Sequence, residues 1–268
     1  MTSTYDCSDT KQRAEGLARA QRALAAKQCV VIPTDTVYGI AADAFSPQAV
    51  ATLLAAKGRG RSMPPPVLIP RLQTMEGLAS DVHPDARRLA EAFWPGGLTL
   101  IMRAQPSLTW DLGETYGTVA LRMPDDAAAL ELLVLTGPLA VSSANRTGQA
   151  AATSATDAYG QLGESVEVYL DDGGRDGGAG ASTIVDATRQ PMTVVREGVI
   201  SIERLREVVP GIGLPGQDAQ DGSANKDSGD GDTEADAGDG DTEADASDGA
   251  ADEDATVSSE RPLPQERN

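Results

Sequence analysis

Short apolar segments alternate with longer amphipathic segments along the first 208 residues of the chain. Within residues 9–27, leucines and alanines recur at helical spacing, which predicts an amphipathic helix. Residues 29–33 follow as a continuous apolar run with the length of a buried strand. Ser46 and Pro47 are typical of an N-cap and a first helical turn, so a second helix is predicted from there to Lys57.

The same alternation continues to the end of this region. Further strands are predicted at residues 67–69, 98–102, 118–122, 139–141, 166–170, 183–185 and 193–195. Further helices are predicted from His83-Pro84 to about Trp94, over residues 125–135 and over residues 201–208. Because strands and helices intermix and not every strand is followed by a helix, we expect an α/β (α+β mixed) fold with a mixed sheet flanked by helices.

The charge of the chain is concentrated at one end. Of the net charge of −19, residues 214–268 supply −14, from 17 acids and 3 bases, which leaves −5 for residues 1–213. After about Pro210 the apolar residues other than alanine almost vanish, and GDGDTEADA occurs twice in tandem. Such a segment cannot offset its ordering entropy. We therefore predict a folded domain at residues 1–209 and a disordered acidic tail at residues 210–268.

Composition removes several classes of function. Two cysteines, Cys7 and Cys29, cannot form a disulfide framework or a multi-cysteine zinc site. His83 is the only histidine, and its place before Pro84 favours an exposed position near a helix start over a catalytic triad. The chain has no N-terminal apolar leader and no apolar run of membrane-spanning length, so we expect a cytoplasmic protein without a membrane partner.

Polar residues gather where the predicted strands end. Thr34, Asp35, Thr36 and Tyr38 follow the strand at residues 29–33, which is more polar side chains than a simple turn requires. Ser142, Ser143 and Asn145 follow the strand at residues 139–141, where open sheets bind ligands, although turn chemistry alone also uses these residue types.

Cations are the second component of the pattern. Lys57, Arg59 and Arg61 follow a helix at alternate positions, as an anion clamp would require, although a solvated helix C-terminus is an alternative. Arg122 and Arg196 end apolar strands. A guanidinium fixed on a strand suits a carboxylate ligand, whereas the alternative for Arg122 is a structural ion pair with Asp125 or Asp126.

Together these residues predict a concave site lined by hydroxyls and arginines, without a metal-ligand cluster or a histidine base. Such a site suits an enzyme that positions charged ligands rather than one that attacks with its own side chain.

Seven motifs, in chain order, carry a resemblance to a known family. They are PTDTVYG (residues 33–39), KGR (57–59), FWPGGLT (93–99), TVALRMP (118–124), SSANRTG (142–148), STIVD (182–186) and VREG (195–198). This combination resembles the YrdC-like threonylcarbamoyl-AMP synthase family over about residues 10–208. The resemblance implies a twisted open sheet around a large concave, positive cavity. It also implies a nucleotidyltransferase that converts L-threonine, bicarbonate or CO2 and ATP to threonylcarbamoyl-AMP and pyrophosphate.

The resemblance further implies a place in tRNA modification, because the product feeds N6-threonylcarbamoyladenosine formation by a transfer complex that acts on tRNA. Weak binding of tRNA by the chain itself is a possible addition. Mg²⁺ would accompany ATP, and no metal would be held by protein ligands alone. The N-carboxylate of threonine would attack the α-phosphorus of ATP, and pyrophosphate would leave in line.

Site roles are carried over from the family position by position. For L-threonine, Thr36 would contact the substrate with Thr34 close by, Arg122 would hold the carboxylate, and the backbone of Val141 would lie against it. The expected ATP-binding residues are Lys57, Arg59, Met63, Thr118, Ser143 and Arg196. The expected catalytic set is Lys57, Arg59, Ser143 and Asn145, of which Lys57 and Asn145 would lie at the phosphates and the reacting carboxylate.

The sequence departs from the family in the segment after KGR. The family has approximately N-P-L-x-x-H there, whereas this chain has MPPPVLIP at residues 63–70. The family histidine is therefore missing, and Met63, at the position of the ATP-contacting asparagine, can offer only its backbone. Ala151 stands where the family has a serine, and the acidic tail is not the second domain that some members carry.

Two other functions remain open at this point. A non-catalytic RNA-binding module of the same fold could use the basic residues at 57–61 to meet phosphates. A carbamoyl-transfer domain of hydrogenase maturation is related, but nothing in this chain matches the zinc-finger and acylphosphatase-like regions of those larger enzymes.

Overall fold

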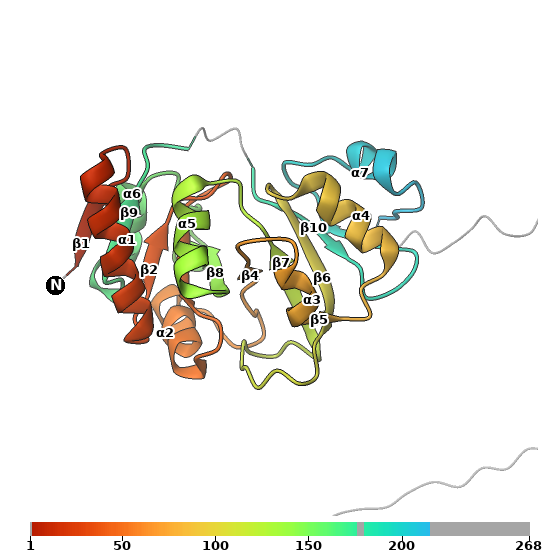
Figure 1. Ribbon diagram of the computed structural model, residues 1–268, viewed down its shortest axis with the longest axis horizontal. Coiled ribbons are helices and arrows are strands. Elements are labelled where there is room, and N and C mark those ends of the chain that lie inside the picture. The colour runs from red at the N-terminus through yellow and green to blue at the C-terminus, as the bar shows by residue number, and fades with distance from the viewer. Residues whose placement is uncertain (1, 176–179, 215–268) are drawn as a thin grey trace, which may run out of the picture. The chain divides into compact units, whose positions relative to one another are not determined.

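The computed structural model describes residues 2–175 and 180–214 (Figure 1). From residue 215 on, the predicted acidic tail lies outside the described residues. Residues 210–214 still pack on the folded part, because Ile212 is buried and Gly213 pairs with Thr193. None of the helices in the described ranges is long and apolar enough to cross a membrane.

Most of the predicted elements form where the pattern places them. The strands are β1 (Ser3–Asp6), β2 (Val30–Ile32), β3 (Gly39–Asp43), β4 (Val67–Leu68), β5 (Ala79–Ser80), β6 (Leu98–Ala104), β7 (Thr118–Arg122), β8 (Leu139–Ser143), β9 (Val168–Asp171), β10 (Thr183–Asp186) and β11 (Thr193–Arg196). The helices are α1 (Thr10–Ala25), α2 (Pro47–Lys57), α3 (Thr74–Leu78), α4 (Pro84–Phe93), α5 (Ala127–Thr136), α6 (Ala155–Leu162) and α7 (Ile202–Val208), with a 3₁₀ turn at Gly163–Ser165.

Side-chain caps explain where several helices begin. Asp9, Ser46 and Asp126 each accept a hydrogen bond from the backbone N–H three residues ahead, at the starts of α1, α2 and α5. His83 also caps its helix, α4, through the Nδ1 atom, which accepts from the backbone N–H of Asp85. The prediction that His83 lies at a helix start is confirmed.

The elements missing from the prediction are β1, β3, β5, α3 and α6. β3 has the sequence GIAAD, which has small residues in place of the β-branched ones that mark a strand, and it is nonetheless buried in the sheet. β1 has the polar sequence STYD and lies at the edge of the sheet beside β9. Tertiary packing, rather than the strand propensity of their own residues, therefore determines that these segments form strands.

The described strands form one mixed sheet, as predicted. Their order is β1-β9-β2-β3-β8-β4-β7-β6-β10-β11, and β5 pairs with β6 off this path. β9 is parallel to β1 and β2, β4 is parallel to β7, and β6 is parallel to β10, while the remaining pairs are antiparallel.

Helices cover the two faces of the sheet unequally. α1 and α5 pack side by side over β2, β8 and β9 (Figure 1), where Val30 and Ile32 belong to their apolar cluster. Val31 points to the other face and joins the larger cluster under the remaining helices. Strand β2 is thus buried on both faces, which explains its unbroken apolar run.

The side chains of strand β6 alternate between the helix-packed core and the opposite face of the sheet. Its residues Leu98, Leu100 and Met102 pack in the core with α4, while Thr99 and Ile101 alternate onto the opposite face. A cavity lies on that face, lined by residues of β4, β7, β6 and β10 among others, and none of its lining residues in the described ranges belongs to a helix.

Tyr38 fixes the segment between β2 and β3 to the end of β9. Its side chain is fully buried, its hydroxyl donates to the carbonyl of Gly173 at 2.6 Å, and the same oxygen accepts the N–H of Asp172 at 2.9 Å. The guanidinium of Arg175 lies 5.6 Å from the centre of the Tyr38 ring. The hydroxyl is therefore bound to the segment after β9, although Tyr38 is also among the residues that line the cavity on the sheet.

Tyr38→Phe is expected to lower the free energy of unfolding by about 1–3 kcal/mol, because the N–H of Asp172 and the carbonyl of Gly173 lose the partly buried hydroxyl that they bind. Urea denaturation measures this change. The matched control is Tyr116→Phe, since Tyr116 is 89% exposed and should change stability by less than about 0.5 kcal/mol. Equal effects of the two substitutions would contradict the anchoring role of Tyr38.

Candidate functional site

A cavity of about 540 Å³ opens over the helix-free part of the sheet. Its walls come from the segments that follow β2, β8 and α2, from the faces of β4, β6 and β7, and from β10 and β11. Nine of the predicted site residues line it: Thr34, Thr36, Arg59, Thr118, Arg122, Val141, Ser143, Asn145 and Arg196. Lys57 and Met63 do not. The fold thus brings together residues that are far apart in the sequence.

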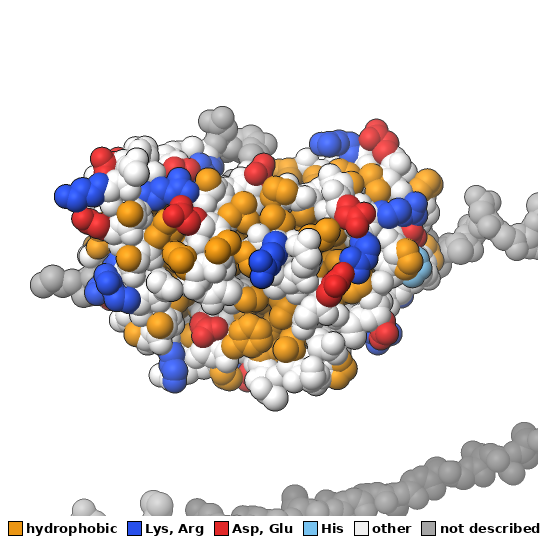
Figure 2. Space-filling model, in the orientation of Figure 1, with side chains coloured by type: hydrophobic (Ala, Val, Ile, Leu, Met, Phe, Trp, Pro, Cys, Tyr) orange, Lys and Arg blue, Asp and Glu red, His pale blue; other side chains and the backbone are white. Residues whose placement is uncertain are grey.

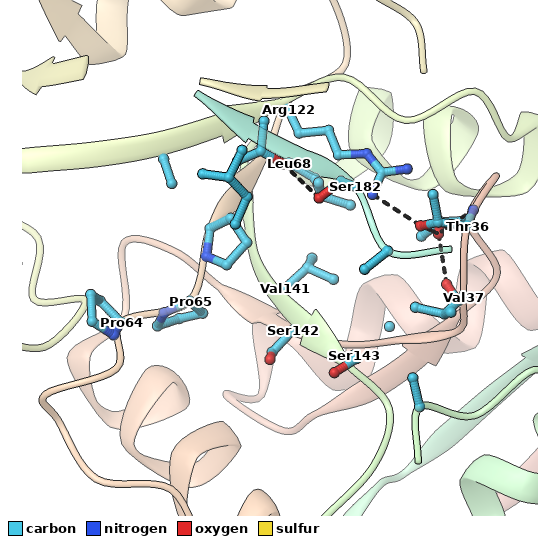
Figure 3. A pocket seen from close by; sticks show the side chains of 18 of the residues that line it. Thr36, Val37, Pro64, Pro65, Leu68, Arg122, Val141, Ser142, Ser143 and Ser182 are labelled. Atoms are coloured by element: carbon cyan, nitrogen blue, oxygen red, sulfur yellow. Dashed lines mark hydrogen bonds between the residues drawn. The ribbon is translucent and has the colours of Figure 1, made fainter. Parts of the chain in front are cut away.

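The segment after β2 contributes two linked hydroxyls. Thr34 Oγ1 lies 3.1 Å from Thr36 Oγ1 and donates to the carbonyl of Val37 at 2.6 Å, and it also accepts the N–H of Thr36. Both threonines are buried, and these bonds fix their orientation. Figure 3 shows Thr36 beside Val37. The Thr36 hydroxyl in turn accepts a hydrogen bond from Arg122.

Arg122, the last residue of β7, is only 7% exposed. Its Nε donates to the carbonyl of Gly96 at 3.0 Å, Nη1 to Thr36 Oγ1 at 3.0 Å, and Nη2 to Asp35 Oδ1 at 2.6 Å. Burial lowers the pKa of Arg122, and the neighbouring Asp35 carboxylate opposes that shift. An ion pair therefore exists, but its acid is Asp35, so the alternative of a pair with Asp125 or Asp126 was wrong.

The three cations at residues 57–61 separate in space. Arg59 points to the cavity, where its Nη1 donates to Ser142 Oγ at 2.9 Å and its Nε is buried without a partner. Arg61 points outward and pairs with Asp111 at 2.8 Å. The chain turns between them because Gly58 ends α2 in the left-handed conformation, with φ of 61°. They do not form one clamp or one basic surface cluster.

Lys57 is buried beneath the segment that follows β8. Its ammonium donates to the carbonyl of Ser143, to the carbonyl of Asn145 at 2.6 Å and to Asn145 Oδ1 at 3.4 Å. The carbonyl of Lys57 also accepts the N–H of Thr147. Burial lowers the pKa of Lys57 to about 8, and the positive charge of Arg59 adds to this shift. In this structure Lys57 therefore organises residues 143–147 from behind the cavity wall.

The end of β8 supplies the next part of the wall. Ser143 and Asn145 line the cavity together with Ser142, and Figure 3 shows Ser142 and Ser143 at the tip of the strand. Asn145 is held by its amide nitrogen, which donates to the carbonyls of Arg146 and Gln149. The backbone N–H of Val141 is already used, because it donates to the carbonyl of Pro66 at 2.8 Å.

Sequence reasoning missed a hydroxyl pair on the opposite side. Ser182 Oγ lies 2.9 Å from Thr99 Oγ1, and both line the cavity. The carbonyl of Ser182 accepts from both Nε and Nη2 of Arg196, so this pair also orients the predicted arginine. Thr99 belongs to the FWPGGLT motif and Ser182 to the STIVD motif, both of which carry the family resemblance, but neither residue was assigned a role in the site.

The segment that departs from the family forms an apolar wall. Pro64, Pro65 and Pro66 line the cavity, whereas Met63 is 41% exposed and lies outside the lining. Prolines have no backbone N–H, so this wall offers only carbonyls and ring carbons. Because Met63 does not line the cavity, the structure does not place its backbone where the prediction of an ATP contact requires it.

The charged side chains that line the cavity are all basic among the described residues. Arg59, Arg122 and Arg196 line it, and among the described residues none of the lining side chains is a carboxylate. Burial lowers the pKa of Arg59, and burial with the proximity of Arg122 lowers that of Arg196, as expected for cations that share a small space. Such a site favours anions with several charges, such as carboxylates and phosphates.

Comparison with known proteins places this geometry in a family. A family model described as telomere recombination, that of Sua5, YciO and YrdC, matches residues 22–198. The chain belongs to the Sua5, YciO and YrdC family. The resemblance drawn from the seven motifs is thereby confirmed.

Relatives in this family carry names that refer to one reaction. A Mycobacterium leprae protein named, provisionally, threonylcarbamoyl-AMP synthase is 53% identical over 209 residues, which are 78% of this chain and 94% of the relative. The threonylcarbamoyl-AMP synthase of Pyrococcus abyssi is 34% identical over 181 residues, 67% of this chain and 53% of that protein.

A solved Sua5/YciO/YrdC structure has the same fold. Pyrococcus abyssi Sua5 complexed with L-threonine matches with a TM-score of 0.72 and 29% identity, over 80% of this chain and 62% of that one. The chain thus spans about three fifths of that protein's length.

Lys57→Met is expected to change how stability depends on pH. The pKa of Lys57 is about 8 in the folded state, whereas that of an unperturbed lysine is 10.5, so between these values the unfolded chain binds more protons than the folded chain. The wild type should then gain free energy of unfolding relative to Lys57→Met as the pH rises from about 8 to 10.5.

Urea denaturation at several pH values measures this difference. Lys11→Met is the control, because Lys11 is exposed on α1 and should leave the pH profile unchanged. A wild-type profile parallel to that of Lys57→Met would contradict a destabilising burial of the Lys57 charge.

Proposed function

We propose that the chain is an L-threonylcarbamoyladenylate synthase. It would convert L-threonine, bicarbonate or CO2 and ATP to threonylcarbamoyl-AMP and pyrophosphate. The observation that carries the proposal is the cavity itself: of the described residues, three arginines, several hydroxyls and no carboxylate line it, at the positions where the family motifs stand. The names of relatives and the L-threonine complex of Sua5 support the same reaction.

The threonine subsite is assigned to the end of the cavity at Arg122. Thr36, Arg122 and Val141 all line the cavity, Arg122 donates to the Thr36 hydroxyl, and Thr34 holds Thr36 in place. The α-carboxylate of threonine matches the guanidinium in charge, and the apolar Val141 suits the methyl group.

The ATP subsite is assigned to the other arginines. Arg59, Thr118, Ser143 and Arg196 line the cavity and offer cations and hydroxyls to the triphosphate and ribose. Asn145 completes this side. Lys57 acts there through Asn145 and Ser143, whose carbonyls accept hydrogen bonds from its ammonium.

The reaction needs no nucleophile from the protein. The amine of threonine captures CO2 and loses a proton to solvent, which gives an N-carboxylate. An oxygen of that carboxylate attacks the α-phosphorus of ATP, and pyrophosphate leaves with the electrons of the broken P–O bond. The protein holds the reacting atoms in line and stabilises the charge that develops on the phosphates. The only histidine caps α4, so it supplies no base within the cavity lining.

Mg²⁺ would enter as part of the ATP substrate complex. The donors that line the cavity are hydroxyls and amides, and the described residues contain no group of three or more acids, histidines or cysteines that could hold a metal. This donor set suits an ion bound chiefly by phosphate oxygens and water.

The proposed product is a mixed anhydride, so a transferase must consume it. By resemblance, that partner is the complex that transfers the threonylcarbamoyl group to adenosine in tRNA. We place the enzyme in the cytoplasm on the same basis.

The first experiment is pyrophosphate release from ATP and bicarbonate, with and without L-threonine. We expect threonine-dependent release that is weak with L-serine and absent with L-alanine. Folded protein that releases no pyrophosphate with threonine would overturn the proposal and favour the RNA-binding module, which would bind tRNA with a steep salt dependence and consume no ATP.

The structure gives that alternative little support. Its basic cluster at residues 57–61 is divided between the protein interior, the cavity and a surface ion pair. On the face shown in Figure 2, basic and acidic side chains are interspersed, without a continuous basic area among the described residues.

Arg122→Ala is expected to raise the KM for threonine about tenfold to a hundredfold, because charge-assisted hydrogen bonds to the substrate carboxylate are lost. Initial rates at varied threonine concentration measure this effect. Arg13→Ala is the matched control, since Arg13 pairs with Glu131 outside the cavity lining. An unchanged threonine KM in a folded, active Arg122→Ala enzyme would remove the carboxylate-binding role of Arg122.

A further inference from the structure

Asp35 is partly buried beside the site without lining it. Its side chain is 17% exposed, and its Oδ1 accepts two hydrogen bonds, one from Arg122 Nη2 at 2.6 Å and one from the backbone N–H of Asp125 at 3.0 Å. The acid therefore contacts the arginine and the segment after β7, but it is not among the cavity-lining residues.

These two bonds connect distant parts of the sheet. Asp35 follows β2 and Arg122 ends β7, and the strands β3, β8 and β4 lie between β2 and β7 in the sheet. At about 4.8 Å per strand, four spacings separate β2 from β7 by roughly 19 Å. Residues 33–38 connect β2 to its neighbour β3, so the hydrogen bonds of Asp35 to Arg122 and Asp125 tie this connection to the end of β7.

The remaining donors of Arg122 show what this fastening achieves. A guanidinium has five N–H bonds, and Gly96, Thr36 and Asp35 each accept from a different nitrogen. Two N–H bonds remain, one on each Nη nitrogen. With three nitrogens held, the plane of the group cannot rotate, and the two remaining donors keep one direction relative to the cavity.

We propose that Asp35 is a positioning residue that sets the orientation of Arg122 for a substrate carboxylate. The inference rests on the proposed function, because it takes that carboxylate to be the one of L-threonine. Asp35 acts through geometry: its charge alone would oppose the binding of an anion at Arg122, since two negative groups would then share one guanidinium.

Charge and geometry can be separated by two conservative variants. Asp35→Asn retains an oxygen acceptor at the same position and removes the charge. Asp35→Glu retains the charge and moves the carboxylate by one methylene. If Asp35 acts by geometry, Asp35→Glu should raise the threonine KM about tenfold, and Asp35→Asn should leave it close to the wild-type value.

The test is steady-state pyrophosphate release by the full-length chain, with threonine and ATP varied separately. We expect the effect of Asp35→Glu on the KM for threonine and little change in the KM for ATP. In the Arg122→Ala background, Asp35→Glu should have no further effect on the threonine KM, because the residue it positions is gone. Glu131→Asp, in the ion pair with Arg13, is the matched control.

Each outcome bears on the proposal. Equal threonine KM values for wild type and Asp35→Glu, equal rises in both variants, or an undiminished effect in the Arg122→Ala background would overturn it. A parallel rise in the KM for ATP would instead indicate a general structural role and would also overturn it. Calorimetric titration of threonine into each variant repeats the comparison if turnover is too slow.

The proposed function can fail separately. If the wild type neither binds threonine nor releases pyrophosphate, the synthase assignment falls and the role of Asp35 falls with it. If the wild type is active and the Asp35 variants behave alike, only the positioning role is wrong.

Discussion

Arg122 carries a positive charge at the buried end of β7, and a charge in such a place is stable only when its donors have partners. The carbonyl of Gly96, the hydroxyl of Thr36 and the carboxylate of Asp35 meet this requirement. Because these partners come from the turn before β6 and the segment after β2, satisfying one side chain draws three parts of the chain together. The cavity is the space left on the face of the sheet that α1 and α5 leave open.

The remaining polar groups follow the same rule of fixed partners. Thr34 holds Thr36, the carbonyl of Ser182 holds Arg196, and Lys57 holds the backbone of residues 143–145. Hydrogen bonds within the protein therefore orient each of these groups before any ligand binds. In a site for the proposed transfer of an adenylyl group, this preorganisation is the protein's main contribution, because the substrates supply both the nucleophile and the leaving group.

Sequence patterns were sufficient to find the polar residues at the strand ends, but they could not predict the directions of the side chains. Thr36, Arg122 and Ser143 could be found because each follows or ends an apolar run. The partner of Arg122 could not, because Asp35 is 87 residues away and only the strand order brings it near. Lys57, Arg59 and Arg61 looked equivalent at alternate positions, but the left-handed turn at Gly58 breaks any period and sends them in three directions.

The proline wall has a consequence for the thermodynamics of binding. Pro64, Pro65 and Pro66 have fixed φ angles and no flexible side chains, and the carbonyl of Pro66 is tied to the N–H of Val141. A ligand that settles against this wall has few protein torsions to freeze, so this side of the cavity contributes little to the entropy lost on association. Selectivity there must come from shape, since the wall presents no backbone N–H with which to distinguish one polar group from another.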